Sequence, residues 1–192
     1  MPDWPAGVGL EKHVEIDSTN AEALRRAAQG ARGPLWVIAE RQTAGRGRRG
    51  RSWSASNGDF AASFLITVEG DPAKAALRSF VAALGLFDAL VEVTDRPDIF
   101  ALKWPNDVLL SGSKLSGILL ETGVAGALAI GIGVNLVTAP GPEDLPPGAV
   151  PAVSLSDTTG VQITPDAFLR VLAPALLRWE STFRAEGFAP VR

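Results

Sequence analysis

A basic, glycine-rich segment is the first part of the chain whose residue types are suited to chemistry. It runs from 41 to 53, directly follows an apolar run, and alternates glycine with arginine. Glycines let the backbone turn sharply and approach a ligand, and the N–H groups of such turns bind anions. Guanidinium groups add bidentate partners for phosphate or carboxylate. The segment predicts a site for a phosphate-bearing small ligand; contact with RNA or DNA and a plain solvated loop are the alternatives.

A second segment carries two lysines around an Asn-Asp pair. Lys103 and Lys114 lie at or near the ends of apolar runs, and Asn106 and Asp107 lie between them. A lysine that faces into a site supplies a point charge for a carboxylate or a phosphate. Taken singly, Asn106 and Asp107 are explained as well by a turn, and a lysine at a strand end by solvation. The functional interpretation therefore depends on the occurrence of all four residues close together in the sequence.

Two shorter segments have weaker signals. Gly131 and Gly133 interrupt an apolar strand, which indicates a bulge, a tight packing contact or a ligand that passes close. Ser18, Thr19 and Asn20 precede or open a predicted helix, whose free N–H groups can bind a polar ligand. The spacing of Thr19 to Glu22 matches a capping box, so Thr19 is the predicted N-cap.

Hydrophobic periodicity and turn residues predict the elements that must position these segments. The predicted strands are 13–16, 35–40, 60–68, 99–103, 108–110, 115–121 and 127–136. The predicted helices are 19–29, 73–91 behind an N-cap at Asp71, and 165–186, and the long loops are 41–57 and 139–151. Hairpins and helices follow one another without regular strand–helix alternation. This order predicts an α+β fold with a mixed, largely antiparallel sheet flanked by helices.

Composition limits the class of protein. The chain has 192 residues, of which 46% are hydrophobic, and this supports one core and one domain over 1–192. The net charge of −3 argues against nucleic-acid binding by bulk electrostatics. The absence of cysteine excludes disulfides and Cys-based zinc sites, and no His/Asp/Glu set has metal-ligand spacing. We find no signal peptide and no apolar run long enough to cross a membrane, and expect a cytoplasmic protein.

Together, these segments resemble biotin protein ligases. The resemblance covers about 16–136, and its most specific part is Gly-Arg-Gly-Arg-Arg-Gly-Arg-x-Trp with a downstream Lys-Trp-Pro-Asn-Asp. It implies a fold similar to the catalytic domains of class II aminoacyl-tRNA synthetases. It also implies a two-step reaction: ATP activates the biotin carboxylate as biotinyl-5′-AMP with release of pyrophosphate, and a lysine of a biotin carboxyl carrier domain then takes the biotin with release of AMP.

The resemblance implies three sets of site residues. The biotin contacts are Ser18, Thr19, Asn20, Gln42, Gly45, Arg46, Gly47, Arg48, Lys114 and Gly117. The ATP or adenylate contacts are Arg48, Arg51, Trp53, Asn106, Lys114 and Asn135. The catalytic set is Lys114, Arg46 and Arg48, which bring the carboxylate and phosphate together, with Asp107 to guide the incoming lysine. Mg²⁺ accompanies ATP, with no protein ligand predicted for it.

Two expectations concern the shape of this site. The apolar tail of biotin needs an apolar slot, which we expect around Leu115, Gly117 and Gly133. The basic, glycine-rich segment 41–53, which we call the arginine-rich loop, is expected to order over biotin or the adenylate. In that position it would keep water from the reactive anhydride.

The resemblance also predicts the partners and the domains. Relatives continue into a small β-barrel domain, and some begin with a DNA-binding domain; we expect neither here, because no predicted strand begins before residue 13 and the last predicted helix ends at residue 186. The predicted partner is the carrier domain of acetyl-CoA carboxylase or of another biotin-dependent carboxylase, with no DNA or membrane partner. A homodimer is left open.

Three alternatives stand beside this interpretation. A lipoate ligase would share the fold, but such enzymes resemble the pattern Arg-Arg-x-x-Gly-Gly-Gly-x-Val-Tyr-His-Asp, and this chain has no tyrosine. An RNA- or DNA-binding role predicts a basic face wider than the loop. A biotin-binding pseudoenzyme would retain the first binding step without turnover.

Overall fold

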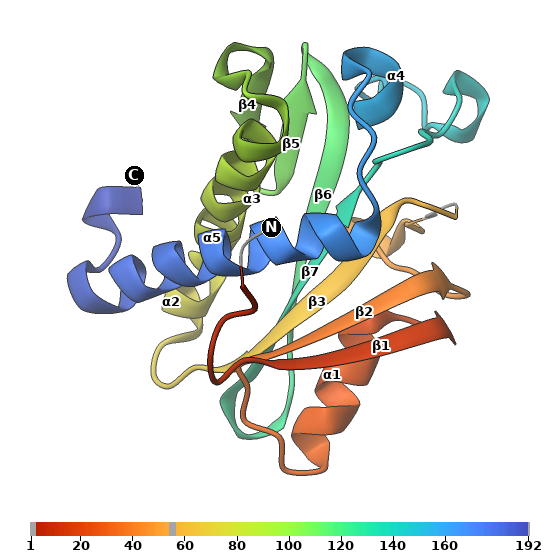
Figure 1. Ribbon diagram of the computed structural model, residues 1–192. Helices are drawn as coiled ribbons and strands as arrows, with labels where there is room; N and C mark the ends of the chain where they lie inside the picture. The colour runs from red at the N-terminus through yellow and green to blue at the C-terminus, as the bar shows by residue number, and fades with distance from the viewer. Residues whose placement is uncertain (1–2, 54–56, 192) are drawn as a thin grey trace.

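One seven-stranded sheet forms the centre of the molecule (Figure 1). The computed structural model describes residues 3–53 and 57–191, so residues 54–56 of the predicted loop 41–57 lie outside the described part. The strands are β1 Gly9–Ile16, β2 Leu35–Gln42, β3 Phe60–Thr67, β4 Phe100–Lys103, β5 Asp107–Leu110, β6 Ser113–Thr122 and β7 Ala127–Val134. Their order across the sheet is β1-β2-β3-β7-β6-β5-β4.

Pairing in this sheet is mixed, as predicted. β1 and β2 run parallel because α1 (Thr19–Ala28) connects them as a crossover. The other neighbouring pairs of the described sheet are antiparallel. The predicted α+β class is therefore confirmed.

Helices cover both faces of the sheet. The side chains of Phe64 and Ile66 point from β3 into the larger core, which includes residues of α3 (Arg78–Thr94) and α5 (Pro165–Glu186). Leu65 points to the opposite face, where it clusters with Ala23 of α1. Side chains alternate along a strand, so residues 61 and 63 of β3 face the α1 side with Leu65. Figure 1 shows α1 on one side of the sheet and α5 on the other.

The helical predictions needed three corrections. The predicted helix 73–91 is two helices, α2 (Pro72–Ala76) and α3, which meet at Leu77. α4 (Leu155–Thr159) was not predicted, because five residues are too short to show a helical period. The N-cap of α1 is Ser18, whose backbone is extended and whose hydroxyl accepts a hydrogen bond from the Ala21 N–H; Thr19 is already helical.

The strand boundaries shift by a few residues. β1 begins at Gly9 instead of residue 13, because it is an edge strand with exposed and half-buried side chains and has no apolar run to mark its start. The predicted strand at residue 99 begins one residue later, after a short 3-10 segment, η2 (Pro97–Ile99). The other short 3-10 segments are η1 Arg48–Gly50, η3 Val124–Gly126, η4 Pro142–Asp144 and η5 Ala189–Val191.

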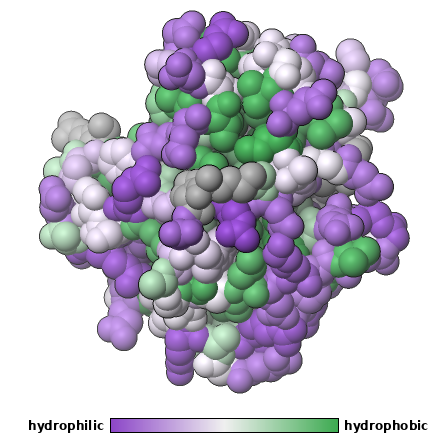
Figure 2. Space-filling view, viewed as in Figure 1, coloured by the Kyte–Doolittle hydropathy of each residue, from purple (hydrophilic) through white to green (hydrophobic). Residues whose placement is uncertain are grey.

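The surface is mostly polar around the edges of the molecule. Figure 2 shows hydrophilic residues along most of the outline, with apolar side chains gathered mainly in the upper half of the view. Trp104 and Val14 are the most exposed of the large apolar side chains that are described, at 68% and 74%. None of the described helices is long and apolar enough to cross a membrane.

Candidate active site

A cleft with a volume of about 940 Å³ collects the segments that the sequence singled out. It is lined by the start of α1, the end of β2, the arginine-rich loop, residues 103–107, parts of β6 and β7, and the loop after β7. Each of the predicted site residues except Gly45 lines it. A Cβ on Gly45 would lie 2.4 Å from the Trp53 carbonyl oxygen, so this glycine permits the loop to close on itself beside the cleft.

One end of the cleft, next to α1, is neutral and hydrogen-bonded. We call it the α1 end and define it by Ser18, Thr19, Asn20 and Gln42, which line the cleft, and by the buried Ser63, which contacts Thr19 and Asn20. The Thr19 N–H and hydroxyl both donate to Gln42 Oε1, at 2.8 and 3.1 Å. This holds the oxygen of the Gln42 amide inward. Gln42 lines the cleft, and with its oxygen held in this way its amide nitrogen is the group that remains to donate to a ligand.

Asn20 is held by three strands at this end. Its Nδ2 donates to Leu119 O at 3.2 Å and to Glu121 Oε2 at 2.8 Å, both on β6. Its Oδ1 accepts from the Ser63 hydroxyl of β3 at 2.5 Å. A Cβ on Gly131 of β7 would lie 2.5 Å from Oδ1, so glycine is needed there to admit the amide. The close approach that Gly131 indicated is therefore made by Asn20.

Ser63 and Glu121 were not predicted as site residues. Ser63 is fully buried and also contacts Thr19 Oγ1 at 2.8 Å, so one hydroxyl links two predicted biotin residues. A lone hydroxyl in an apolar strand was the available signal for Ser63. Glu121 ends an apolar strand, and nothing in the local sequence indicates its partners.

An ion pair holds the start of α1 at this end. Arg25 donates to both oxygens of Asp17, at 2.9 and 2.7 Å, and Asp17 accepts from the Ser18 N–H at 2.7 Å. These hydrogen bonds, chiefly those from Arg25, lower the pKa of Asp17 to about 2. The turn that presents Ser18 to the cleft is thus fastened to the helix that follows it.

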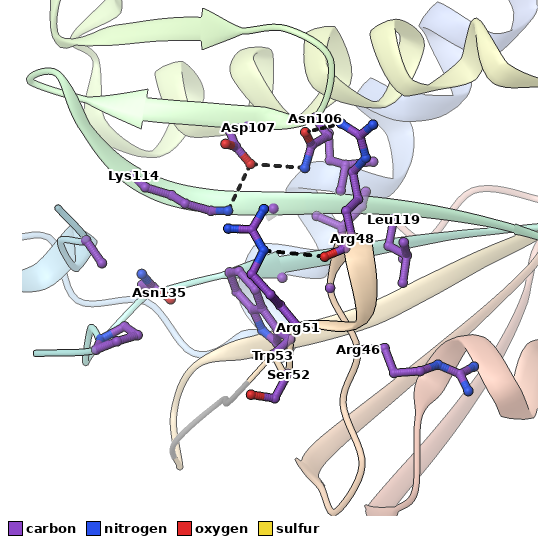
Figure 3. Close-up of a pocket in the computed structure, with 18 of the residues that line it drawn as sticks. Arg46, Arg48, Arg51, Ser52, Trp53, Asn106, Asp107, Lys114, Leu119 and Asn135 are labelled. Carbon is purple, nitrogen blue, oxygen red and sulfur yellow. Dashed lines mark hydrogen bonds and ion pairs between the residues drawn. The ribbon is translucent and has the colours of Figure 1, made fainter. Parts of the chain in front are cut away.

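The arginine-rich loop folds back as a small hairpin. Arg46 and Ser52 form an isolated antiparallel bridge, and the Gly47 N–H donates to Arg51 O at 2.7 Å. Arg49 takes a left-handed conformation at φ 59° inside η1. The hairpin separates the arginine side chains: Arg48 reaches Asn106, Arg51 extends toward the side of Lys114, and Arg46 points away from both (Figure 3).

The opposite end of the cleft is charged, and we call it the Lys114 end. Lys114 Nζ lies 2.9 Å from Asp107 Oδ1, which also accepts from Asn106 Nδ2 at 3.1 Å. Asn106 Oδ1 in turn accepts from Arg48 at 2.9 Å. An irregular register between Val108 and Leu109 lets Asp107 lie opposite Gly117. Figure 3 shows this chain of contacts from Lys114 to Arg48.

Trp53 covers part of the floor between the two ends. Its indole lies against Gly117 and Gly133, where a Cβ would come within 3.0 and 2.2 Å of the ring. Lys114 Nζ lies 5.9 Å from the ring centroid. Of the residues expected around the apolar slot, Gly117 and Gly133 line the cleft beside the Trp53 indole, whereas Leu115 is fully buried in the larger core.

Two buried polar residues fasten the loop that follows β7. Asn135 Nδ2 donates to Val153 O at 3.1 Å. Asp59, which was not predicted, accepts from the N–H groups of Val137 and Thr138 at 2.9 and 3.1 Å. Asn135 therefore positions the loop that borders the Lys114 end as well as lining the cleft.

Metal-ligating side chains gather elsewhere in the described part. Glu11, His13 and Glu22 place one ligand atom each within 4.8 Å of one another, which sequence spacing had not predicted. None of the three lines the cleft. Arg26 contacts both glutamates, and its hydrogen bonds lower the pKa of Glu11. The cluster is therefore already paired with a cation.

The comparisons with known proteins match this arrangement of strands and site segments. A sequence model described as "Biotin/lipoate A/B protein ligase family" matches residues 14–136, which is more than half of the chain. The chain belongs to this ligase family.

Curated relatives of this ligase are close in sequence. It is 49% identical over 183 residues to "Biotin--[acetyl-CoA-carboxylase] ligase" of Paracoccus denitrificans, which covers 93% of this chain and 76% of the relative. It is 36% identical over 182 residues to the protein of the same name from Mycobacterium tuberculosis, which covers 90% of this chain and 65% of that relative. Both relatives are longer than this chain.

Solved structures agree with the fold of the ligase. The biotin protein ligase from Aquifex aeolicus in complex with biotin and ATP has a TM-score of 0.78 at 30% identity, covering 95% of this chain and 74% of that one. The biotin protein ligase from Leishmania major in complex with biotinyl-5-AMP has a TM-score of 0.76 at 25% identity, covering 93% of this chain and 76% of that one. These matches confirm the predicted class of sheet.

Proposed function

We propose that this ligase activates biotin with ATP as biotinyl-5′-AMP and transfers the biotin to a lysine of a biotin carboxyl carrier domain. The observation that carries the proposal is the polarity of the cleft: a neutral hydrogen-bonding end and a cationic end share one cavity. Biotin has a neutral ureido head and an anionic tail. The α1 end suits the head, and the Lys114 end suits the carboxylate and the phosphates of ATP.

The α1 end binds the head through fixed hydrogen-bonding groups. Gln42 presents its Nε2 donor because Thr19 holds its oxygen. Such preorganisation lowers the cost of ordering side chains when the ligand binds. Relatives of this family crystallise with biotin and ATP or with biotinyl-5-AMP, which supports these ligands for the cleft.

The Lys114 end offsets charge repulsion in the first step. The carboxylate of biotin attacks the α-phosphate of ATP, and pyrophosphate leaves. Lys114, Arg48 and Arg51 stabilise the negative charge that develops at phosphorus, because their positions are set before the reaction. Asp107 and Asn106 hold Lys114 and Arg48 in place. Trp53, on the floor between the two ends, and Asn135 also line the cleft, and we expect them to contact the adenylate.

Mg²⁺ enters with ATP in this proposal. The carboxylates that line the described part of the cleft are those of Asp59, Asp107 and Asp144, and the first two hold Thr138 and Lys114. That set does not form a cage for a resident ion. Mg²⁺ typically binds substrate phosphates and keeps several waters, so the ion would neutralise the pyrophosphate.

The second step takes place at Asp107. The lysine of the carrier must be neutral to attack the mixed anhydride. Asp107 lies at the Lys114 end with 16% of its side chain exposed, so it can accept a proton from an incoming amine. AMP then leaves. We place the reaction in the cytoplasm, where ATP and carboxylases occur together.

The test of this function compares biotin with lipoate as the substrate acid and measures adenylate formation and transfer to the carrier separately. The wild-type protein is incubated with ATP, Mg²⁺ and either biotin or lipoate, and acyl-adenylate is measured by mass spectrometry. A carrier domain is then added, and the mass of its lysine-containing peptide is followed. We expect biotinyl-5′-AMP and a biotinylated lysine. Preference for lipoate, or the absence of biotin binding in calorimetry, would contradict the proposal; adenylate without transfer would limit it to the first step.

A further inference from the structure

One carboxylate, Glu121, joins the α1 end of the cleft to the arginine-rich loop. Its Oε2 accepts from Asn20 Nδ2 at 2.8 Å, and its Oε1 lies 3.1 Å from Arg46 Nη2. Asn20 and Arg46 come from different elements, the first from α1 and the second from the loop. Glu121 does not line the cleft, whereas both of its partners do.

The contacts of Asn20 leave its amide one orientation. Both N–H groups of its Nδ2 meet acceptors that cannot donate, Leu119 O and the Glu121 carboxylate. The oxygen must therefore face Ser63, whose hydroxyl donates to it. Asn20 thus uses its donors within the protein, and Glu121 is the charged anchor of that arrangement.

The contacts of Arg46 separate it from the other cations. Its guanidinium lies on Glu121, while Arg48 contacts Asn106 at the Lys114 end. Figure 3 shows Arg46 pointing away from Arg48, Arg51 and Lys114. An arginine in this position holds the base of its loop against β6.

We propose that Glu121 is a positioning residue that fastens the arginine-rich loop, through Arg46, to the α1 end of the cleft. Arg46 then acts as a clamp on the biotin side and does not hold the phosphates of ATP. The inference rests on the proposed function, because biotin and ATP are the ligands that reveal it. A fastened loop slows the escape of biotin and of its adenylate.

The ion pair between Arg46 and Glu121 is partly exposed to water. Its loss should therefore change ligand binding without changing the stability of the fold. The side chains of Arg46 and Glu121 are 50% and 27% exposed, and exposed ion pairs contribute little to stability. Removing the pair should therefore leave the melting temperature unchanged. Substitution of a residue with only a structural role would instead lower the stability of the fold and weaken the binding of biotin, the adenylate and ATP together.

The experiment is a double-mutant cycle on the full chain with Glu121→Gln and Arg46→Ala. The amide oxygen introduced by Glu121→Gln can still accept from Asn20, but the charge that holds Arg46 is lost. We measure the release of biotinyl-5′-adenylate by filter binding, the Kd of biotin by calorimetry and the KM of ATP. Each single variant should release the adenylate about tenfold faster and weaken biotin binding about threefold, with the KM of ATP within about twofold of wild type.

The double variant and two controls decide the outcome. The double variant should release the adenylate no faster than either single variant, and Arg46→Lys should restore most of the retention. Glu15→Gln removes the ion pair to Arg41 outside the cleft and should change nothing. Additive effects, or a KM of ATP raised about tenfold by Arg46→Ala alone, would overturn the inference. If the wild type forms no adenylate, the proposed function fails. If the wild type forms the adenylate and the Glu121→Gln variant retains the adenylate as well as the wild type does, only this inference fails.

Discussion

The two ends of the cleft are built in different ways. At the α1 end, Ser18, Thr19 and Asn20 are each at most 4% exposed, and short hydrogen bonds hold their partners Gln42 and Ser63. At the Lys114 end, the cations lie on strand ends and on a hairpin, and the side chain of Lys114 is 28% exposed. The neutral end is set before a ligand arrives. The charged end is more exposed to water, and ion pairs and hydrogen bonds to Asp107 and Asn106 hold Lys114 and Arg48 there.

This difference follows from the chemistry of the groups. Neutral amides and hydroxyls tolerate burial when each is hydrogen-bonded, so they can form a rigid pocket. Buried lysines and arginines are costly, and long cationic side chains keep contact with water unless a partner charge is close. A site that must hold both a ureido group and phosphates therefore combines a buried end with an open one.

Loss of the central cation should have the largest effect. Lys114→Met should lower the rate of adenylate formation by about 10² to 10³-fold, because it removes a fixed charge at the reacting phosphate. Biotin affinity should fall much less. Pyrophosphate release at saturating substrates measures the rate. Lys12→Met is the matched control, since Lys12 pairs with Asp166 away from the cleft; an equal loss in both variants would contradict the comparison.

A change at the buried end should affect stability and affinity together. Gln42→Leu leaves the Thr19 N–H without its acceptor, so the free energy of unfolding should fall by about 1–3 kcal/mol. Biotin should bind about tenfold more weakly, because the Nε2 donor is also lost. Urea unfolding and calorimetry measure the two effects. Gln162→Leu, at an exposed position, should stay within about 0.5 kcal/mol of wild type.

Alanine substitutions at two glycines of β7 allow a direct comparison of the contacts made by Asn20 at the α1 end and by Trp53 on the floor of the cleft. Gly131→Ala would press a methyl group against Asn20, which three hydrogen bonds hold in place. Gly133→Ala would press one against Trp53, whose buried indole N–H has no hydrogen-bond partner in the described part of the chain. We expect Gly131→Ala to be more destabilising, by about 1 kcal/mol, within the usual range for overpacking. Urea midpoints of the two variants check this. The reverse order would mean that Trp53 is the more firmly held of the two contacts.

The smallest effect should come from the ion pair beside Ser18. Because Arg25 lowers the pKa of Asp17 to about 2 from 3.8, the pair stabilises the fold above pH 4, and this contribution is lost as the pH falls towards 2. Both side chains are almost half exposed, so the effect should be below about 1 kcal/mol. Asp17→Asn should be slightly less stable than wild type at pH 6, with a gap that narrows below pH 4. Urea unfolding at a series of pH values measures the gap, and a constant gap would contradict this assignment.

Much of the fold and of the cleft could be predicted from the sequence. Apolar alternation along 60–68 and 127–136 identified the central strands, and Asp71 marked the start of a helix, because these signals act within a few residues. The arginine-rich loop and the Lys103–Asp107 segment were recognised for the same reason. The chemical roles assigned to these residues stay predictions until the variants are measured.

The sequence by itself determined the residue types of the site and the family. Only the tertiary structure decided which polar groups meet. Asn20 bonds to Ser63 and Glu121, 43 and 101 residues away, and Arg46 pairs with Glu121, whereas the nearby Arg48 contacts Asn106. Nothing in the sequence distinguishes Ser63 from other hydroxyl residues in strands; its role follows from the position of β3 beside α1. The physical reason is that hydrogen bonds and ion pairs act over a few ångströms in space, whereas sequence patterns report only on neighbours along the chain.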